Sequence, residues 1–161
     1  MKIVDRLPLL LCLLACSGFF GFKRVFNTTL SQSANTISFG GASVVVDMTD
    51  CSPDNSSDGK SRAIAAINSS TASMCTLQFG TLEPANGAYL TIQEEPIGEG
   101  QVILGGAGSS FGGGFIAAAG QGVIITSGQG KYHAAFKDIT LLDPATKKMT
   151  GKKISGSFGC H

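Results

Sequence analysis

The chain has 161 residues and a formal net charge of +1, with 22 glycines, no tryptophan and 14% charged residues. An ordinary apolar share with low charge excludes intrinsic disorder, and near-neutrality with few arginines argues against a nucleic-acid partner. The length that remains after an export segment suits one domain with one core.

The N-terminal segment has the pattern of an export signal. Lys2 and Arg6 supply positive charge, and an apolar run from Leu7 to Ala15 follows. Such a run has the ~7–15 residues of a secretory signal and is shorter than the ~20 residues that span a bilayer. We therefore expect an exported chain in which residues 1–15 are the signal peptide.

The end of this signal, LLAC at Leu13–Cys16, resembles the lipobox of bacterial lipoproteins. The resemblance implies cleavage before Cys16, acyl chains on its thiol and new amino terminus, and anchoring in the cell envelope, at the outer membrane or cell surface. Two alternatives stay open, namely secretory cleavage after Ser17 and an uncleaved anchor extended by Phe19 and the phenylalanines after it. All three export the chain.

Residues 16–35 are expected to form a tether. They are polar around Asn27 and Ser31 and show no apolar periodicity. A lipid-anchored domain needs such a spacer between itself and the membrane. Residues 36–161 are then left as a single β domain.

From Thr36 onward, short alternating apolar segments are separated by turn-forming residues, which is the pattern of β-strands. About seven to nine such strands, with at most one short helix, predict an all-β fold, an antiparallel sandwich or barrel. The residues expected to share core-facing sides of strands are Val44, Val46 and Met48; Cys75, Leu77 and Phe79; Tyr132, Ala134 and Phe136; and Ile154, Gly156, Phe158 and Cys160.

Three local features refine this expectation. The apolar phase jumps between Phe136 and Ile139, which predicts a β-bulge near Lys137-Asp138. The turn residues at 84–87 predict that residues 88–93 return beside the preceding strand. The segment 61–68, SRAIAAIN, is the one helix candidate.

Beyond the export segment, the cysteines are Cys51, Cys75 and Cys160. In an oxidising compartment two of them can pair and one thiol is left over. We favour Cys51–Cys75, which would link two strands if those strands are neighbours, although the sequence leaves the connectivity open. Because no Cys-x-x-Cys spacing occurs, we do not expect a zinc site. We expect no cofactor.

Two motifs resemble functional sites, one catalytic and one calcium-binding, but each lacks a feature that such a site needs. Gly108–Gly112 matches the nucleophile elbow around Ser110, but a glycine-rich strand, not a helix, is expected after it. Asp54, Ser56 and Asp58 place oxygens at alternate positions, as calcium loops do, yet Ala65 stands where the closing glutamate belongs. We therefore expect no catalytic residue, and at most a weak calcium site. His133 is out of phase with its core-facing neighbours and is expected to face outward.

Two stretches, from Cys75 to Tyr89 and from Gly130 to Cys160, resemble units of small β-rich bacterial envelope lipoproteins. The resemblance implies fold and location and brings no catalytic residues with it. We expect a non-enzymatic envelope protein with a binding or structural role, attached to the membrane through its N-terminal lipid. Its partner would be an envelope protein or a glycan.

Two other functions stay open. One is a carbohydrate-binding or adhesion module in which Tyr89 or Tyr132 stacks on a sugar. The other is a small envelope serine hydrolase that uses Ser110.

Overall fold

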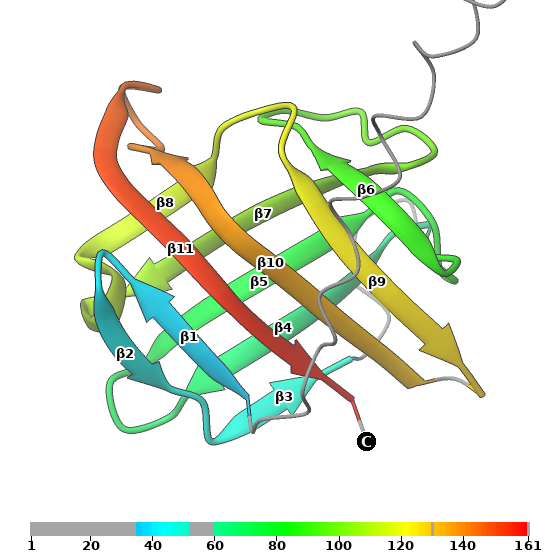
Figure 1. Cartoon of the computed structure of the whole chain (residues 1–161), viewed down its shortest axis with the longest axis horizontal. Helices are drawn as coiled ribbons and strands as arrows, with labels where there is room; N and C mark the ends of the chain where they lie inside the picture. Colours follow the sequence, from blue (N-terminus) through cyan, green and yellow to red (C-terminus); the bar gives the residue numbers. More distant parts are fainter. Residues whose placement is uncertain (1–34, 52–59, 130, 161) are drawn as a thin grey trace, which may run out of the picture. The chain divides into compact units, whose positions relative to one another are not determined.

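The computed structural model describes residues 35–51, 60–129 and 131–160, which form an all-β domain with a single turn of 3-10 helix (Figure 1). The predicted fold class is confirmed, although the strands are more numerous than expected. Their bounds are β1 Thr36–Phe39, β2 Ala42–Val45, β3 Met48–Asp50, β4 Arg62–Asn68, β5 Ser73–Phe79, β6 Gly87–Thr91, β7 Gln101–Gly108, η1 Ser109–Phe111, β8 Gly113–Ala117, β9 Gly122–Gly128, β10 Lys131–Leu142 and β11 Met149–Gly159.

The strands hydrogen-bond in the order β2-β1-β11-β10-β9-β6-β7-β5-β4-β3, and β8 pairs with both β7 and β10. Strands β6 and β7 run parallel, while the other pairs between the described strands are antiparallel. Because β8 joins β7 to β10, the pairing closes a circuit through β9 and β6. In Figure 1 strands β9, β10 and β11 cross in front of β4, β5 and β7. The sheet therefore folds over into two layers.

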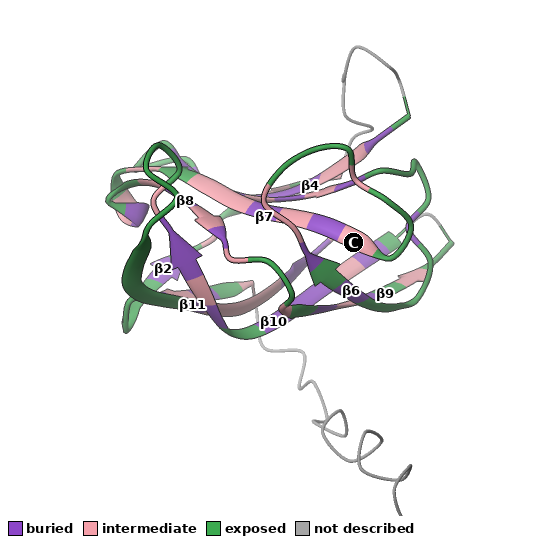
Figure 2. Ribbon diagram, turned by 90° about the horizontal axis from the view of Figure 1, so that it is seen from above, coloured by how far each residue is buried: buried purple, intermediate pink, exposed green. Residues whose placement is uncertain are grey.

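The core lies between these layers and takes side chains from both. Figure 2 colours the buried residues of the two layers purple. Phe79 and Leu104 come from one layer, and Ile37 and Phe158 from the other, and all four are fully buried. Each such side chain contributes about 1.5–3 kcal/mol when it leaves water. The predicted inward positions on β5, β10 and β11 are confirmed where they carry side chains that pack in this core.

The predicted bulge in β10 is present. Phe136 pairs with Gly156 and Ile139 with Ile154, so two residues of β10 lie opposite Ser155. Asp138 takes a φ of +53°, and its backbone N–H donates to Ser155 Oγ at 2.8 Å. The extra residue restores the phase, so that the apolar side chains before and after it both point into the core.

The predicted helix is wrong, because residues 62–68 form strand β4. This strand lies between β3 and β5 and pairs with both of them. Ile64 and Ala66 face the core. Alanine has the highest intrinsic helix propensity, but this preference is small per residue, and pairing with two neighbouring strands outweighs it.

Two expectations about neighbouring strands are also wrong. Val44 is buried, but the chain turns a corner after β2 and leaves Met48 51% exposed on β3. Strand β6 does not return beside β5, because β5 pairs with β7 and β6 crosses to pair with β9. The corner and the crossing both follow from folding the sheet into two layers.

The disulfide joins Cys51 to Cys160, across a sequence separation of 109 residues. The favoured Cys51–Cys75 pair is wrong, because β4 separates β3 from β5 and Cys75 points into the core. A hydrogen bond of 3.0 Å from Thr49 Oγ1 to the carbonyl of Gly159 lies beside the disulfide. Together these contacts tie the end of β11 to the edge strand β3.

We predict that the Cys75 thiol does not react in the folded protein. The side chain is fully buried, and this burial raises the pKa of its thiol strongly. Peptide mapping after iodoacetamide treatment should show no adduct on Cys75 in buffer and an adduct on Cys75 in denaturant. An adduct formed at equal rates in both conditions would contradict the buried position.

The turn between β10 and β11 is held by Asp143. Its Oδ1 accepts hydrogen bonds from the backbone N–H groups of Ala145 and Thr146, at 3.1 and 2.7 Å, and from the Thr146 hydroxyl at 2.9 Å. The bonds from Thr146, first from its backbone and then from its hydroxyl, lower the pKa of the Asp143 carboxyl. The charged form of this side chain therefore stabilises the turn.

We expect Asp143→Ala to lower stability at pH 7 but to make little difference in strong acid. The folded-state pKa lies below the unfolded one, so the stabilisation is present above an unfolded pKa of about 3.9 and is lost as the pH falls through the folded value. Urea midpoints of the wild type and the variant, measured at pH 7 and again below about pH 3, test this expectation. A gap between the two proteins that stays constant with pH would refute it.

Candidate binding site

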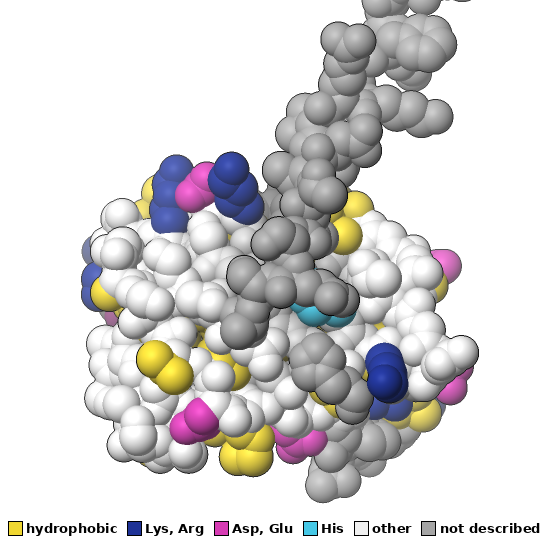
Figure 3. All heavy atoms as spheres, turned by 60° about the horizontal axis from the view of Figure 1, so that its bottom comes forward, with side chains coloured by type: hydrophobic (Ala, Val, Ile, Leu, Met, Phe, Trp, Pro, Cys, Tyr) yellow, Lys and Arg dark blue, Asp and Glu magenta, His cyan; other side chains and the backbone are white. Residues whose placement is uncertain are grey.

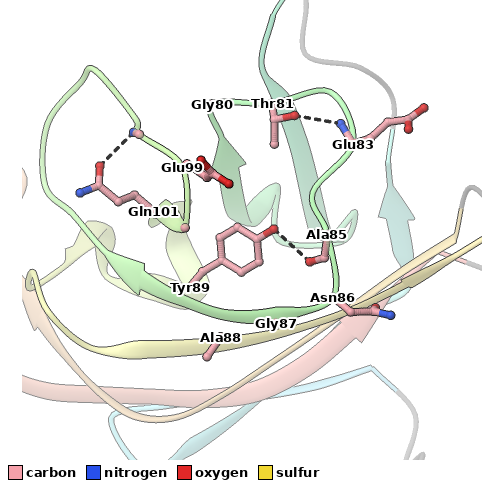
Figure 4. A pocket seen from close by; sticks show the side chains of 12 residues that line it. Gly80, Thr81, Glu83, Ala85, Asn86, Gly87, Ala88, Tyr89, Glu99 and Gln101 are labelled. Atoms are coloured by element: carbon pink, nitrogen blue, oxygen red, sulfur yellow. Dashed lines mark hydrogen bonds between the residues drawn. The ribbon is translucent and has the colours of Figure 1, made fainter.

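A pocket of about 420 Å³ opens beside the start of β6 (Figure 4). Its walls come from three pieces of chain: residues 80–86, the first residues of β6, and residues 98–101. The volume lies within the ~300–1,000 Å³ of small-molecule sites. Glycines at 80, 87, 98 and 100 line much of it, so the backbone itself forms a large part of the surface.

The first wall, residues 80–86, is fixed at three points. Arg62 Nε donates to the carbonyl of Leu82, and the Tyr89 hydroxyl donates to the carbonyl of Ala85 at 2.9 Å. At its far end, the Oδ1 of Asn86 accepts a hydrogen bond from the backbone N–H of Ser127 on β9. This wall is therefore formed without a ligand.

The second wall is a tight turn before β7. The Gly98 N–H donates to Gln101 Oε1 at 2.9 Å, and the Gln101 N–H donates back to the carbonyl of Gly98 at 3.2 Å. Leu90 N–H donates to the carbonyl of Gly100 at 2.9 Å, which attaches the turn to β6. Gly100 has a φ of +71°, a conformation that favours glycine.

Two carboxylates give the pocket its charge. Figure 4 shows the Glu99 side chain extending into the space between the walls and the Glu83 side chain pointing away from it. The ring of Tyr89 forms the floor and is 7% exposed. Burial, reinforced by the negative charge of Glu99, raises the pKa of the Tyr89 hydroxyl. The hydroxyl therefore stays protonated at neutral pH.

Arg62 connects this pocket to the disulfide. Besides Leu82, its guanidinium reaches the carbonyl of Cys51 at 2.5 Å and lies 4.9 Å from the centre of the Tyr132 ring. Such a cation over an aromatic face contributes about 0.5–2 kcal/mol. Arg62 thus joins the disulfide end, the core and one pocket wall.

The two tyrosines do not offer a stacking surface for a sugar. Tyr132 is 6% exposed and already carries the Arg62 guanidinium, while Tyr89 packs edge-on against Phe79 at 5.2 Å between ring centres. Both rings are largely buried, which argues against the stacking role considered above.

Ser110 lies in η1, between strands β7 and β8, and not in a strand-to-helix elbow. Its Oγ is 2.8 Å from Thr71 Oγ1, and its backbone N–H donates to Ser73 Oγ at 2.9 Å. These bonds fasten η1 to the hairpin between β4 and β5. His133 alternates with the buried Tyr132 and Ala134 on β10, as predicted, and is half-buried; it pairs with Thr126 on β9 and Gly159 on β11.

Several predicted sites lie outside the described residues. These are the lipidation site Cys16, with the tether after it, and the calcium candidates Asp54, Ser56 and Asp58. In the described ranges, no three His, Cys, Asp or Glu side chains gather as a metal site would require.

Exposed apolar side chains are scattered over the face shown in Figure 3.

The sequence did not indicate Glu99, Asn86 or Gln101 as members of a site. A signal was available, because glycines cluster around polar residues in both loops. The two loops, residues 80–86 and 98–101, lie close together because β6 pairs in parallel with β7 and antiparallel with β9. No local sequence pattern predicts that pairing.

Comparison with known proteins gives no relative. No family model, no curated protein and no solved structure matches the chain. No helix in the described part of the chain is long and apolar enough to cross a bilayer. The candidate site has to be interpreted from its own chemistry.

Proposed function

We propose that this chain is a lipid-anchored protein of the bacterial cell envelope, whose β-domain binds a small ligand in the pocket beside β6 and catalyses no reaction. The observation that carries the binding role is the fixed geometry of the pocket. Three hydrogen bonds hold one wall and three hold the other. A preformed site loses little conformational freedom on binding, which favours affinity.

The disulfide supports the location. Disulfides persist in oxidising compartments such as the periplasm and the cell surface, and they are rare in the cytosol. The Cys51–Cys160 bond is thus compatible with export. Export in turn agrees with the signal-like segment before Cys16.

The anchor is tested with the full-length protein expressed in a bacterium. Intact mass and detergent phase partitioning are compared between the wild type and Cys16→Ala. A mature chain that begins at an acylated Cys16, and a variant that moves to the aqueous phase, are expected. An unmodified chain that starts after Ser17 would refute the anchor and leave a soluble exported domain.

The pocket is tested separately by protein NMR. The detergent-solubilised full chain is titrated with a mixture of small neutral, cationic and anionic polar compounds. Amide shifts confined to residues 80–90 and 98–101 are expected. Shifts that map elsewhere, or no shifts with any compound, would refute this pocket as the binding site.

Catalysis by Ser110 is tested with a panel of acyl-ester substrates. We expect the wild type and Ser110→Ala to hydrolyse them at the same background rate. Turnover that is lost in Ser110→Ala would establish a hydrolase and overturn the non-enzymatic role.

A further inference from the structure

We infer that the ligand of this pocket carries a primary ammonium group, which the carboxylate of Glu99 binds. The inference rests on the proposed function, since it gives the chemical class of ligand for the same pocket. It follows from the charges, the hydrogen bonds and the size of the site.

The charge of the pocket is negative. Glu83 and Glu99 are its charged lining residues, and neither lysine nor arginine lines it. Among the described residues, the ion pair that forms is between Lys147 and Glu94, at 4.0 Å, so no described lysine or arginine forms an ion pair with the Glu99 carboxylate. An anionic ligand would meet repulsion here, whereas a cation would meet an available charge.

Hydrogen bonding points the same way. The Tyr89 hydroxyl donates to Ala85, the Gly98 N–H to Gln101 Oε1, and the Leu90 N–H to the carbonyl of Gly100. These donors are used within the walls, while the Glu99 carboxylate remains a strong acceptor. An ammonium group brings three donors and no acceptor, which matches that arrangement.

The size of the pocket excludes a bare metal ion as a good fit. A volume of about 420 Å³ is far larger than one ion, and no group of three metal-ligating side chains gathers among the described residues. The ammonium group would occupy the part near Glu99. The glycine-lined remainder would hold the body of the ligand, of the size of a monosaccharide or a short diamine.

Two probes carry a primary ammonium group on different molecules, and a third probe lacks that group. Glucosamine carries an ammonium on a sugar, 1,5-diaminopentane carries it on an alkyl chain, and glucose is the uncharged counterpart. Each is titrated into the detergent-solubilised full chain while amide shifts are followed. We expect one or both amines, and not glucose, to shift the amides of residues 98–101. Shifts with glucosamine alone would indicate an amino sugar, and shifts with both would indicate that the ammonium suffices.

The carboxylate is tested by Glu99→Gln, which keeps the shape and removes the charge. Because Glu99 is exposed to solvent, removing its charge is expected to weaken amine binding about threefold. The matched control is Glu94→Gln, which changes the net charge equally at an exposed position outside the pocket, and it should bind as the wild type does. Equal weakening in both variants would indicate a long-range charge effect and overturn the role of Glu99.

The inference and the proposed function fail differently. If glucose shifts the pocket amides as strongly as glucosamine does, the ammonium inference is overturned and the pocket remains a binding site. If neither amine shifts these amides while another compound of the mixture does, the ligand class is again wrong and the site stands. If no compound shifts them, both are refuted.

Discussion

Replacing Cys160 with serine is expected to lower the free energy of unfolding by about 4 kcal/mol. The Cys51–Cys160 bond closes a loop with a sequence separation of 109 residues, and in the chain-entropy model a loop of that length gives nearly the largest stabilisation a disulfide provides. It also holds Cys51, whose carbonyl accepts a hydrogen bond from Arg62. Urea denaturation of the wild type and Cys160→Ser, followed by circular dichroism, measures the loss.

The wild type unfolded in the presence of a reductant is the control. It should resemble Cys160→Ser, because both lack the same bond. A midpoint in Cys160→Ser equal to that of the oxidised wild type would show that the bond does not stabilise the fold. Agreement between the reduced wild type and the variant would assign the loss to the disulfide itself and not to the serine.

Truncating Phe79 to alanine is expected to destabilise the domain by about 3–5 kcal/mol. The ring is fully buried at the end of β5 and contacts the ring of Tyr89 edge-on, with 5.2 Å between their centres. The substitution leaves a cavity in the core and removes the support beneath the pocket floor. Free energies of unfolding from urea titration test the first effect, and pocket titration by NMR tests the second.

Phe79→Leu is the matched control for this prediction. It keeps most of the volume and is expected to cost less than about 1.5 kcal/mol. If alanine and leucine cost the same, the ring does not fill space that the core depends on. If Phe79→Ala remains folded and its pocket still takes up ligand with unchanged affinity, Tyr89 does not need Phe79 to hold the residue 80–86 wall.

Parts of the fold could be predicted because they depend on neighbours in sequence. A strand places alternate side chains on opposite faces, so the alternation around Leu77 and around Ala134 identified the buried faces of β5 and β10. The bulge at Asp138 was also predictable, since it appears as a shift of that alternation within one strand. These signals needed no knowledge of which strands pair.

Pairing was the information that the sequence lacked. The segment around Ile64 has the composition of a helix and becomes a strand because β3 and β5 flank it. The same strand separates Cys51 from Cys75, and this separation left Cys160 as the partner of Cys51. In each case a contact between distant residues outweighed a local preference.

The candidate site shows the same division. Turn residues between Pro84 and Gly87 predicted a loop, and a loop is present there. That this loop faces residues 98–101 across Tyr89 follows from β6 crossing between the layers to pair with β9 and β7. Glu99 could not be distinguished from other exposed glutamates until that crossing placed it in a pocket.

The sequence by itself thus determined the all-β class, the inward faces of several strands and the bulge at Asp138. All three follow from the alternation of apolar and polar side chains with a period of two residues along each strand. The tertiary structure alone decided the strand order, the Cys51–Cys160 pairing and the pocket around Glu99. These depend on contacts between residues far apart in the chain, and the alternation within a strand carries no information about which other strand lies beside it.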